Sequence, residues 1–227
     1  MWPLRFNAAL ARLGITFAAV FILVTGAASG ALAAPQVGFR DFPYGSGLNH
    51  PPTTAKPESK TWWNDGAWWA CLYNSKLKNY DIYRLDDQNW VDTGTPIDDR
   101  PNSSADALWD SSSSKLYVAS HLYSNTGSSS SSSSNWARLY RFTYHSTSKV
   151  YSQDPGFPVY ITKGKSETLV LTKDSTGRLW VTYVQSSKVM VNHSVSSDDT
   201  WGTPFVLPVS SSAASFKSDD VSSVISF

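Results

Sequence analysis

Short stretches in which every second side chain is apolar or aromatic recur along the chain beyond residue 58. In one of them Lys115, Tyr117 and Ala119 alternate with Leu116, Val118 and Ser120. This period of two is typical of a β-strand, whose successive side chains point to opposite faces. Clusters of Asp, Asn, Ser and Gly separate the stretches and indicate turns. The pattern predicts a succession of short strands.

The stretches follow one plan, which repeats: an apolar strand, a tight turn, an aromatic-rich strand and two more weakly marked strands. Three copies are predicted, at residues 58–98, 102–162 and 166–208, and residues 218–227 resemble the first strand of a fourth. Aligning Trp63, Trp109, Leu171 and Ile225 gives spacings of 46, 62 and 54 residues. These are the periods of four-stranded propeller blades with loops of variable length.

We therefore predict an all-β fold, a β-propeller of four-stranded antiparallel blades. A closed ring typically needs four to eight blades, so about three blades and one strand predict an incomplete ring. The chain is then expected to be the first part of a longer protein, or to associate with the missing remainder of its propeller. A short protein that ends in a frayed strand is the alternative, and a β-sandwich is the competing architecture.

Residues 1–34 have the three parts of a secretory signal peptide. Arg5 and Arg12 precede an apolar run over residues 13–24, and small residues end at Ala34. The apolar run is shorter than the roughly 20 residues that a membrane helix needs, although a retained anchor is the alternative. We expect a secreted or cell-surface protein with no membrane span after cleavage and an irregular lead-in over residues 35–57.

The net charge and the cysteine and histidine content exclude several functional classes. Nineteen Lys and Arg against 18 Asp and Glu leave a net charge of +1, which argues against a nucleic-acid-binding protein. The single cysteine, Cys71, excludes an intrachain disulfide, and the four histidines lack metal-ligand spacing. We predict no metal and no cofactor. The serine-rich segment 127–134 is expected to be a solvated loop.

A basic residue followed by small polar and acidic residues stands just before the first strand of each copy. In a propeller the innermost strands begin beside the central channel, so these clusters are expected to converge on one face around the axis. Such a ring of charges is suited to a sugar or another polar ligand. The alternative is that the residues pair with one another and tie the copies together. The predicted ligand-binding residues are Lys56, Glu58, Arg100, Asp106, Lys165, Glu167 and Asp219.

Two adjacent pairs of tryptophans flank the first tight turn, at 62–63 and 68–69. Sugars stack their apolar faces on aromatic rings, so Trp62 or Trp63 is predicted to be a stacking surface of the same site. Because neighbours along a strand face opposite sides, one member of each pair is expected on each face. Core packing is the alternative for most of the four.

The segment Ser194–Trp201 resembles a degenerate Asp box, the Ser-x-Asp-x-Gly-x-Thr-Trp turn of sialidase-like propellers. Ser194, Thr200 and Trp201 match, whereas Ser196 and Asp198 replace the Asp and the Gly. The chain also looks like the amino-terminal part of secreted bacterial proteins with sialidase-type (BNR) repeats. Segments 63–66, 98–102 and 174–181 carry that likeness.

The resemblance implies a propeller more strongly than an activity. Sialidases use three arginines for the substrate carboxylate, a Tyr nucleophile with a Glu partner, and an Asp acid/base. Arg40 is similar to the first arginine, but no second or third is matched. The expected function is therefore non-catalytic binding of extracellular glycan or another polar ligand. The alternatives are a sialidase-type glycoside hydrolase completed beyond Phe227, with Glu167 as its acid or base, and a protein-interaction scaffold.

Overall fold

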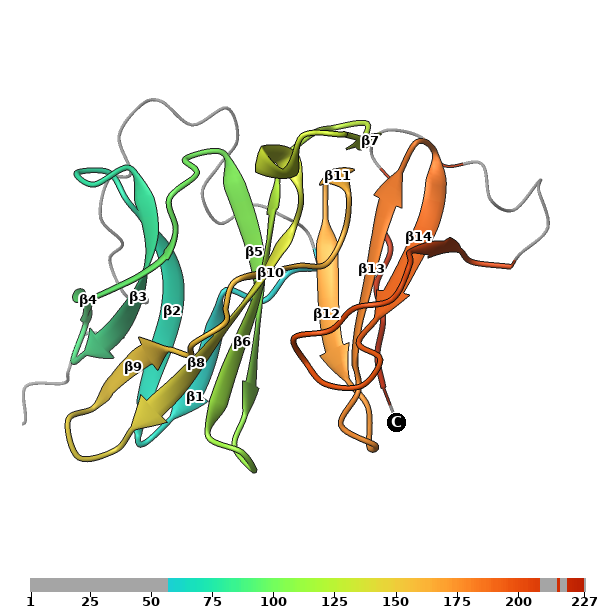
Figure 1. Cartoon of the computed structure of the whole chain (residues 1–227). Helices are drawn as coiled ribbons and strands as arrows, with labels where there is room; N and C mark the ends of the chain where they lie inside the picture. Colours follow the sequence, from blue (N-terminus) through green and yellow to red (C-terminus); the bar gives the residue numbers. More distant parts are fainter. Residues whose placement is uncertain (1–56, 209–215, 217–219, 227) are drawn as a thin grey trace, which may run out of the picture. The chain divides into compact units, whose positions relative to one another are not determined.

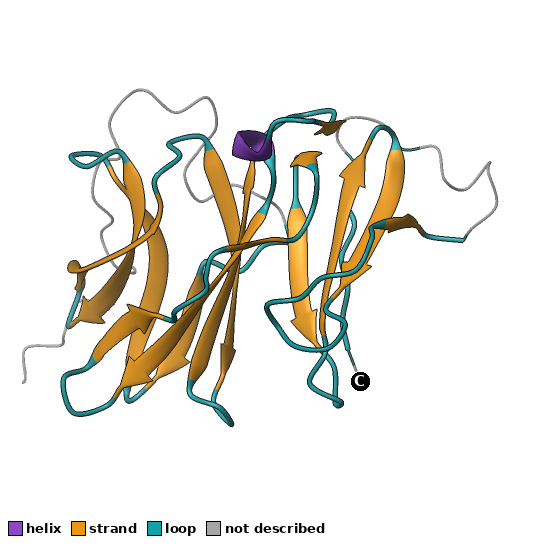
Figure 2. Cartoon of the chain, viewed as in Figure 1, coloured by secondary structure: helices purple, strands orange, loops and turns teal. Residues whose placement is uncertain are grey.

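Nearly every segment of the computed structural model belongs to a strand or to the turn between two strands (Figure 2). The structure describes residues 57–208, 216 and 220–226, all within the unit Phe39–Phe227. The predicted signal peptide, residues 35–56 of the lead-in, and the predicted site residues Lys56 and Asp219 lie outside the described residues.

Most of the described strands form three antiparallel sheets in chain order (Figure 1), and β7 (Ser128–Ser129) and β11 (Gly164–Lys165) form a separate two-stranded sheet. Sheet 1 contains β1 (Thr61–Asn64), β2 (Ala67–Asn74), β3 (Asn79–Asp86) and β4 (Asn89–Asp98). Sheet 2 contains β5 (Ser103–Asp110), β6 (Lys115–Leu122), β8 (Arg138–His145), β9 (Val150–Gln153) and β10 (Val159–Tyr160). Sheet 3 contains β12 (Leu169–Lys173), β13 (Leu179–Gln185), β14 (Lys188–His193) and β15 (Phe205–Val206). The predicted all-β fold with four-stranded antiparallel sheets is confirmed, and the described strands close no ring.

In sheet 2 the fourth position is shared by β9 and β10, which both pair with β8. Pro155 and Pro158 lie between the two short strands. Proline has no backbone N–H to donate, so a continuous ladder is interrupted there. The edge of this sheet is consequently less regular than the edges of sheets 1 and 3.

The first hairpin shows how local sequence fixes a turn. Asn64 pairs with Ala67, which leaves the two-residue loop Asp65–Gly66. Both residues have positive φ, 48° and 74°, as a type I′ turn requires. Asp-Gly is one of the sequences that adopts this turn most readily. The same hairpin places Trp62 opposite Trp69 and Trp63 opposite Trp68.

Sheet 2 is buried on both faces because alternate side chains of its strands enter two different cores. Leu116 and Val118 belong to the core shared with sheet 1. Tyr117 and Ala119 belong to the core shared with sheet 3. The alternation in the sequence therefore marks a strand with two covered faces, not a strand with one face in water.

One sequence-based expectation needs correction, and a second concerns the last described residues. Segment 127–134 is mostly exposed, as expected, but it is not an irregular loop throughout: β7 (Ser128–Ser129) pairs with β11 (Gly164–Lys165), and a 3₁₀ turn, η1, spans Ser133–Asn135. The strand expected over 218–227 is absent from the described residues 220–226. There the hydroxyls of Ser222 and Ser226 bond to sheet 3 instead, at Thr182 and Lys173, so this segment contacts sheet 3 through side chains and not through a strand ladder.

Candidate functional site

The carboxylate of Glu58, just before β1, links all three sheets. Its Oε2 lies 2.8 Å from the ammonium of Lys60 and accepts the hydroxyl of Ser104 at 2.7 Å. Its Oε1 accepts the backbone N–H of Leu169 at 2.9 Å and lies 2.6 Å from Nε2 of His121. The Glu58 side chain is completely buried. These contacts connect the three sequence copies, as the alternative to ligand binding expects. They also occupy the hydrogen-bond acceptor positions of the carboxylate.

The electrostatics of this cluster follow from its partners. Burial alone raises the pKa of a carboxyl group, but Lys60 and His121 outweigh it and hold the pKa of Glu58 well below its ordinary value. An ionised carboxylate only accepts hydrogen bonds, so Nε2 of His121 carries a proton. The other ring nitrogen, Nδ1, lies 3.0 Å from the hydroxyl oxygen of Ser166.

Asp106 of β5 forms a second link between sheets. Its Oδ1 accepts the backbone N–H of Ser59 at 2.5 Å, and its Oδ2 accepts that of Leu171 at 2.7 Å. Burial raises the pKa of Asp106 to about 7, although both hydrogen bonds favour the ionised form. Two of the predicted ligand-binding residues, Glu58 and Asp106, therefore have both carboxylate oxygens bonded to other residues of this chain.

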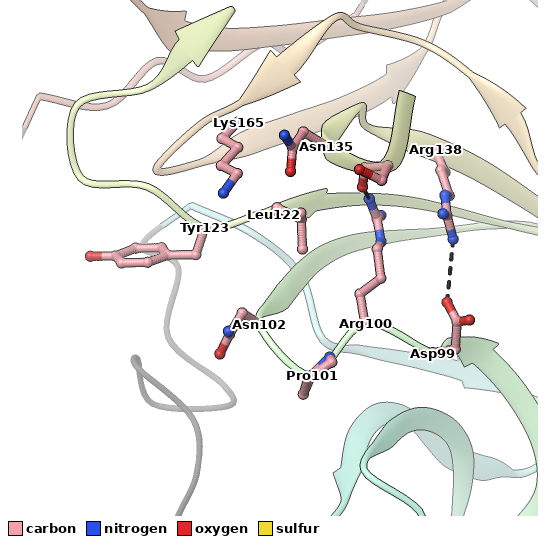
Figure 3. A pocket seen from close by; sticks show the side chains of 10 residues that line it. Asp99, Arg100, Pro101, Asn102, Leu122, Tyr123, Asn135, Arg138 and Lys165 are labelled. Carbon is pink, nitrogen blue, oxygen red and sulfur yellow. Dashed lines mark hydrogen bonds and ion pairs between the residues drawn. The ribbon is translucent and has the colours of Figure 1, made fainter. Parts of the chain in front are cut away.

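Arg100 is fixed at the end of β4. Its Nη2 lies 2.6 Å from Oδ2 of the buried Asp98, which also accepts the hydroxyl of Ser120 at 2.6 Å. Nη1 of Arg100 donates to the backbone carbonyls of Ser134 and Trp136, at 3.2 and 2.9 Å. The guanidinium thus connects sheet 1 to the serine-rich segment, and Figure 3 shows its side chain extending to that segment.

A cavity of about 390 Å³ lies beside Arg100, and we call it the cationic cavity. Figure 3 shows Arg100 and Lys165, both predicted from the sequence, in its lining together with Arg138. Chain segments from sheets 1 and 2, from η1 and from β11 contribute to it. Its lining residues are Asp99, Arg100, Pro101, Asn102, Leu122, Tyr123, Ser134, Asn135, Arg138 and Lys165.

The charges of the cationic cavity are only partly balanced. Arg138 lies 3.4 Å from Asp99, a carboxylate that is 86 % exposed, and Arg100 is paired with the buried Asp98. Lys165 is half-buried, and no carboxylate of the described part of the chain lies within ion-pair distance of its ammonium. The cavity therefore presents one cation without a carboxylate partner, and amide and hydroxyl groups surround it.

The remaining predicted residues lie elsewhere. Trp62 is buried and donates its indole N–H to the Tyr151 hydroxyl at 2.9 Å. Trp63 is 54 % exposed and packs edge-to-face on Trp68, and neither ring lines the cationic cavity. Glu167 is half-buried next to β12 and is also absent from the lining.

Sequence reasoning missed Arg138, Asn135 and Tyr123. Arg138 opens an ordinary aromatic strand, and Asn135 follows a run of serines that predicts only a loop. Neither position carries a motif. Arg138 lies near Arg100 because β8 pairs with β6, and Asn135 does so because Arg100 donates to the neighbouring Ser134 carbonyl. No local pattern specifies either contact.

The segment that resembles an Asp box forms a closed turn between β14 and β15. Ser194 and Trp201 pair as an isolated bridge, and the Trp201 indole donates to the carbonyl of Asp198 at 3.0 Å. The Asp198 carboxylate faces sheet 2, where it pairs with Arg141 at 2.6 Å and accepts the Tyr117 hydroxyl at 2.9 Å. This turn ties sheet 3 to sheet 2.

No protein-family model matches the chain, and no curated protein matches it either. Within the residues that the structure describes, no three His, Cys, Asp or Glu side chains are grouped so that they could hold a metal ion. The same residues contain no helix of the length and apolar character needed to cross a membrane.

Proposed function

We propose that the chain is part of a sialidase-like β-propeller that binds an anionic polar ligand, an acidic glycan, in the cationic cavity without catalysing a reaction. The observation that carries the proposal is the Lys165 ammonium. It lines a cavity with two arginines and has no carboxylate partner among the described residues. The ligand carboxylate or sulfate takes the place of that partner.

The propeller part of the proposal rests on topology. Three successive antiparallel sheets of four or five strands run in chain order, and the first strand of the second sheet, β5, adjoins both β1 and β12. Sheets that present their first strands to a common region are the arrangement of propeller blades. The signal-like residues 1–34 support a secreted or cell-surface location.

The lining supplies the chemistry that an acidic sugar needs. Arginine and lysine form charge-assisted hydrogen bonds with carboxylate or sulfate oxygens. Asn135 contributes a side-chain amide to the lining; its N–H₂ donates to Ser130 at 3.0 Å, and its carbonyl oxygen can accept a sugar hydroxyl. A volume of about 390 Å³ falls within the range of small-molecule sites, roughly 300–1,000 Å³.

Non-catalytic binding is favoured over hydrolysis because the described lining of the cavity lacks the carboxyl groups that hydrolysis needs. The hydrolase that the resemblance implies is of the sialidase type, which departs from the usual carboxylate pair by using a Tyr nucleophile. It still needs two carboxyl groups at the scissile bond, a Glu beside that Tyr and an Asp acid/base. Asp99 is the one carboxylate among the lining residues, and it is highly exposed and paired with Arg138. Glu58 and Asp106 are engaged by partners within the protein, which leaves no such pair in the cavity.

The test is a calorimetric titration of the full-length chain with sialyllactose and with a heparin-derived disaccharide, with lactose as the neutral comparison. We expect Lys165→Ala to weaken binding of the acidic sugars at least tenfold, because a hydrogen bond to a charged group contributes about 1.5–3 kcal/mol. Lys188→Ala is the matched control, since Lys188 is exposed on β14 and outside the lining.

Two results would overturn the proposal. One is equal affinity for lactose and the acidic sugars, since the unpaired ammonium would then contribute nothing. The other is a similar loss of affinity in Lys165→Ala and Lys188→Ala, since the effect would then come from net charge and not from the cavity. Circular dichroism of each variant establishes that the fold is retained.

A further inference from the structure

A second cavity, of about 200 Å³, lies between sheets 2 and 3, and we call it the aromatic cavity. Three aromatic side chains form much of its wall. No residue that the structure describes lines both this cavity and the cationic cavity. Its lining residues are Trp136, Tyr160, Ile161, Thr162, Lys163, Asn192, Trp201, Gly202 and Pro204.

Two of the rings form a corner. Trp136 and Tyr160 have ring centroids 5.1 Å apart and planes 82° apart. The ammonium of Lys163 lies 5.3 Å from the centre of the Trp136 ring. Tyr160 is 50 % exposed although it belongs to a paired strand. Its ring is held in place and is still open to a ligand.

The polar atoms of the wall are mostly occupied by the protein itself. The indole N–H of Trp136 donates to the carbonyl of Ser130 at 2.8 Å, and that of Trp201 donates to Asp198 at 3.0 Å. The amide of Asn192 donates to the carbonyl of Ile161 at 2.8 Å. The indoles therefore offer ring surface and not hydrogen-bond donors, while Lys163 remains as an exposed donor.

We propose that the aromatic cavity binds one ring of a neutral saccharide. The sugar stacks its C–H face on Tyr160 beside Trp136, and Lys163 donates to a hydroxyl at its rim. A sugar ring has both an apolar face and a polar edge, and this wall offers both. The volume is below that of a drug-sized site, as expected for a single ring. Lys163 is the one charged residue among the described lining residues. Its side chain is exposed, so water solvates its charge and the ligand needs no opposite charge.

An extended proline-rich peptide is the other ligand that aromatic-lined grooves take. Its backbone carbonyls need donors along the groove, and here both indole N–H groups are already used. The structure therefore favours the saccharide, and the peptide becomes an outcome of the test.

The test uses the full-length chain with cellotetraose, xylotetraose, mannotetraose and N-acetylchitotetraose. Saturation-transfer NMR shows whether the sugar protons contact the protein, and tryptophan fluorescence gives the affinity. We expect binding of at least one of these sugars. Tyr160→Ala is expected to weaken it at least fivefold, and Tyr160→Phe is expected to retain it, because stacking needs the ring and not the hydroxyl.

Trp63→Ala is the matched control, since Trp63 is an exposed ring that does not line the aromatic cavity. Lys165→Ala separates the two cavities: the aromatic cavity is expected to bind equally well in this variant. The proposal is overturned if none of the four sugars binds. It is also overturned if Trp63→Ala and Tyr160→Ala weaken binding equally, or if a decaproline peptide binds through Tyr160 and the sugars do not.

Discussion

At the scale of single residues, Glu58 is the polar side chain with the most consequences for stability. It is completely buried, and its partners come from the segment before β1, from sheet 2 and from β12. Removing one member of a buried charged pair leaves the other charge without compensation. Here the ammonium of Lys60 loses its carboxylate partner and keeps only neutral acceptors, Ser104 and the Ala105 carbonyl. The backbone N–H of Leu169 loses its acceptor at the same time.

We therefore expect Glu58→Ala to lower the free energy of unfolding by about 3–5 kcal/mol, measured by urea denaturation at pH 7. Asp86→Ala is the control. Asp86 also pairs with a cation, Arg84 at 2.6 Å, but its side chain is 44 % exposed, and exposed pairs contribute roughly 0–1 kcal/mol. Comparable losses in the two variants would show that Glu58 does not link the sheets.

At the scale of elements, the pairing of β7 with β11 brings the serine-rich segment to the cationic cavity. Gly164 of β11 has φ of +144°, and a Cβ at this position would lie 2.0 Å from the carbonyl oxygen of Ser128. Only glycine allows this close approach of the two strands. The next residue is Lys165, so the position of its ammonium depends on the same contact.

Gly164→Ala is expected to separate β7 from β11 and to destabilise the protein. It is also expected to weaken acidic-glycan binding, as the separate variant Lys165→Ala does. The comparison is Gly66→Ala, because Gly66 also has positive φ, +74°, but a Cβ there meets nothing within 4 Å. Thermal unfolding followed by circular dichroism and the sialyllactose titration provide the two readouts. Equal effects on both readouts in the two variants would contradict this role of Gly164.

At the scale of the whole molecule, two buried carboxylates make contributions to the free energy of unfolding that change with pH in opposite directions. The pKa of Glu58 is lowered, so its contribution is present above about pH 4.5 and is lost as the pH falls. The pKa of Asp106 is raised from 3.8 to about 7. The folded state then holds a proton that the unfolded chain releases, so stability from this group is complete below about pH 4 and is lost as the pH rises to about 7.

Urea denaturation between pH 5 and 8 measures the second effect. We expect the free energy of unfolding of the wild-type chain to fall across this range, and Asp106→Ala to have a flatter profile, because the group that titrates is gone. The variant is also expected to be less stable at every pH, since the N–H groups of Ser59 and Leu171 lose their acceptor. An unchanged slope would show that Asp106 does not titrate in this range.

The strands and the four-stranded sheets were predictable because their signals are local. Alternation in Lys115–Ser120 specifies a strand wherever that strand lies, and Asp65–Gly66 specifies a tight turn by its backbone preferences alone. The likeness of segment 194–201 to an Asp box similarly located a closed turn between β14 and β15. Residues 220–226, within the strand predicted over 218–227, form no ladder in the structure, since strand propensity creates no ladder without a partner strand.

Tertiary structure alone decided which charged residues line a cavity and which ones hold the sheets together. The sequence places Glu58, Arg100, Asp106 and Lys165 in equivalent positions before or within first strands, and nothing local distinguishes them. Packing of the sheets buries the two carboxylates against backbone N–H groups. It leaves Arg100 and Lys165 at the edge of that packing, facing a cavity. Burial depends on contacts between residues more than 40 positions apart, and a period of two along one strand carries no information about them.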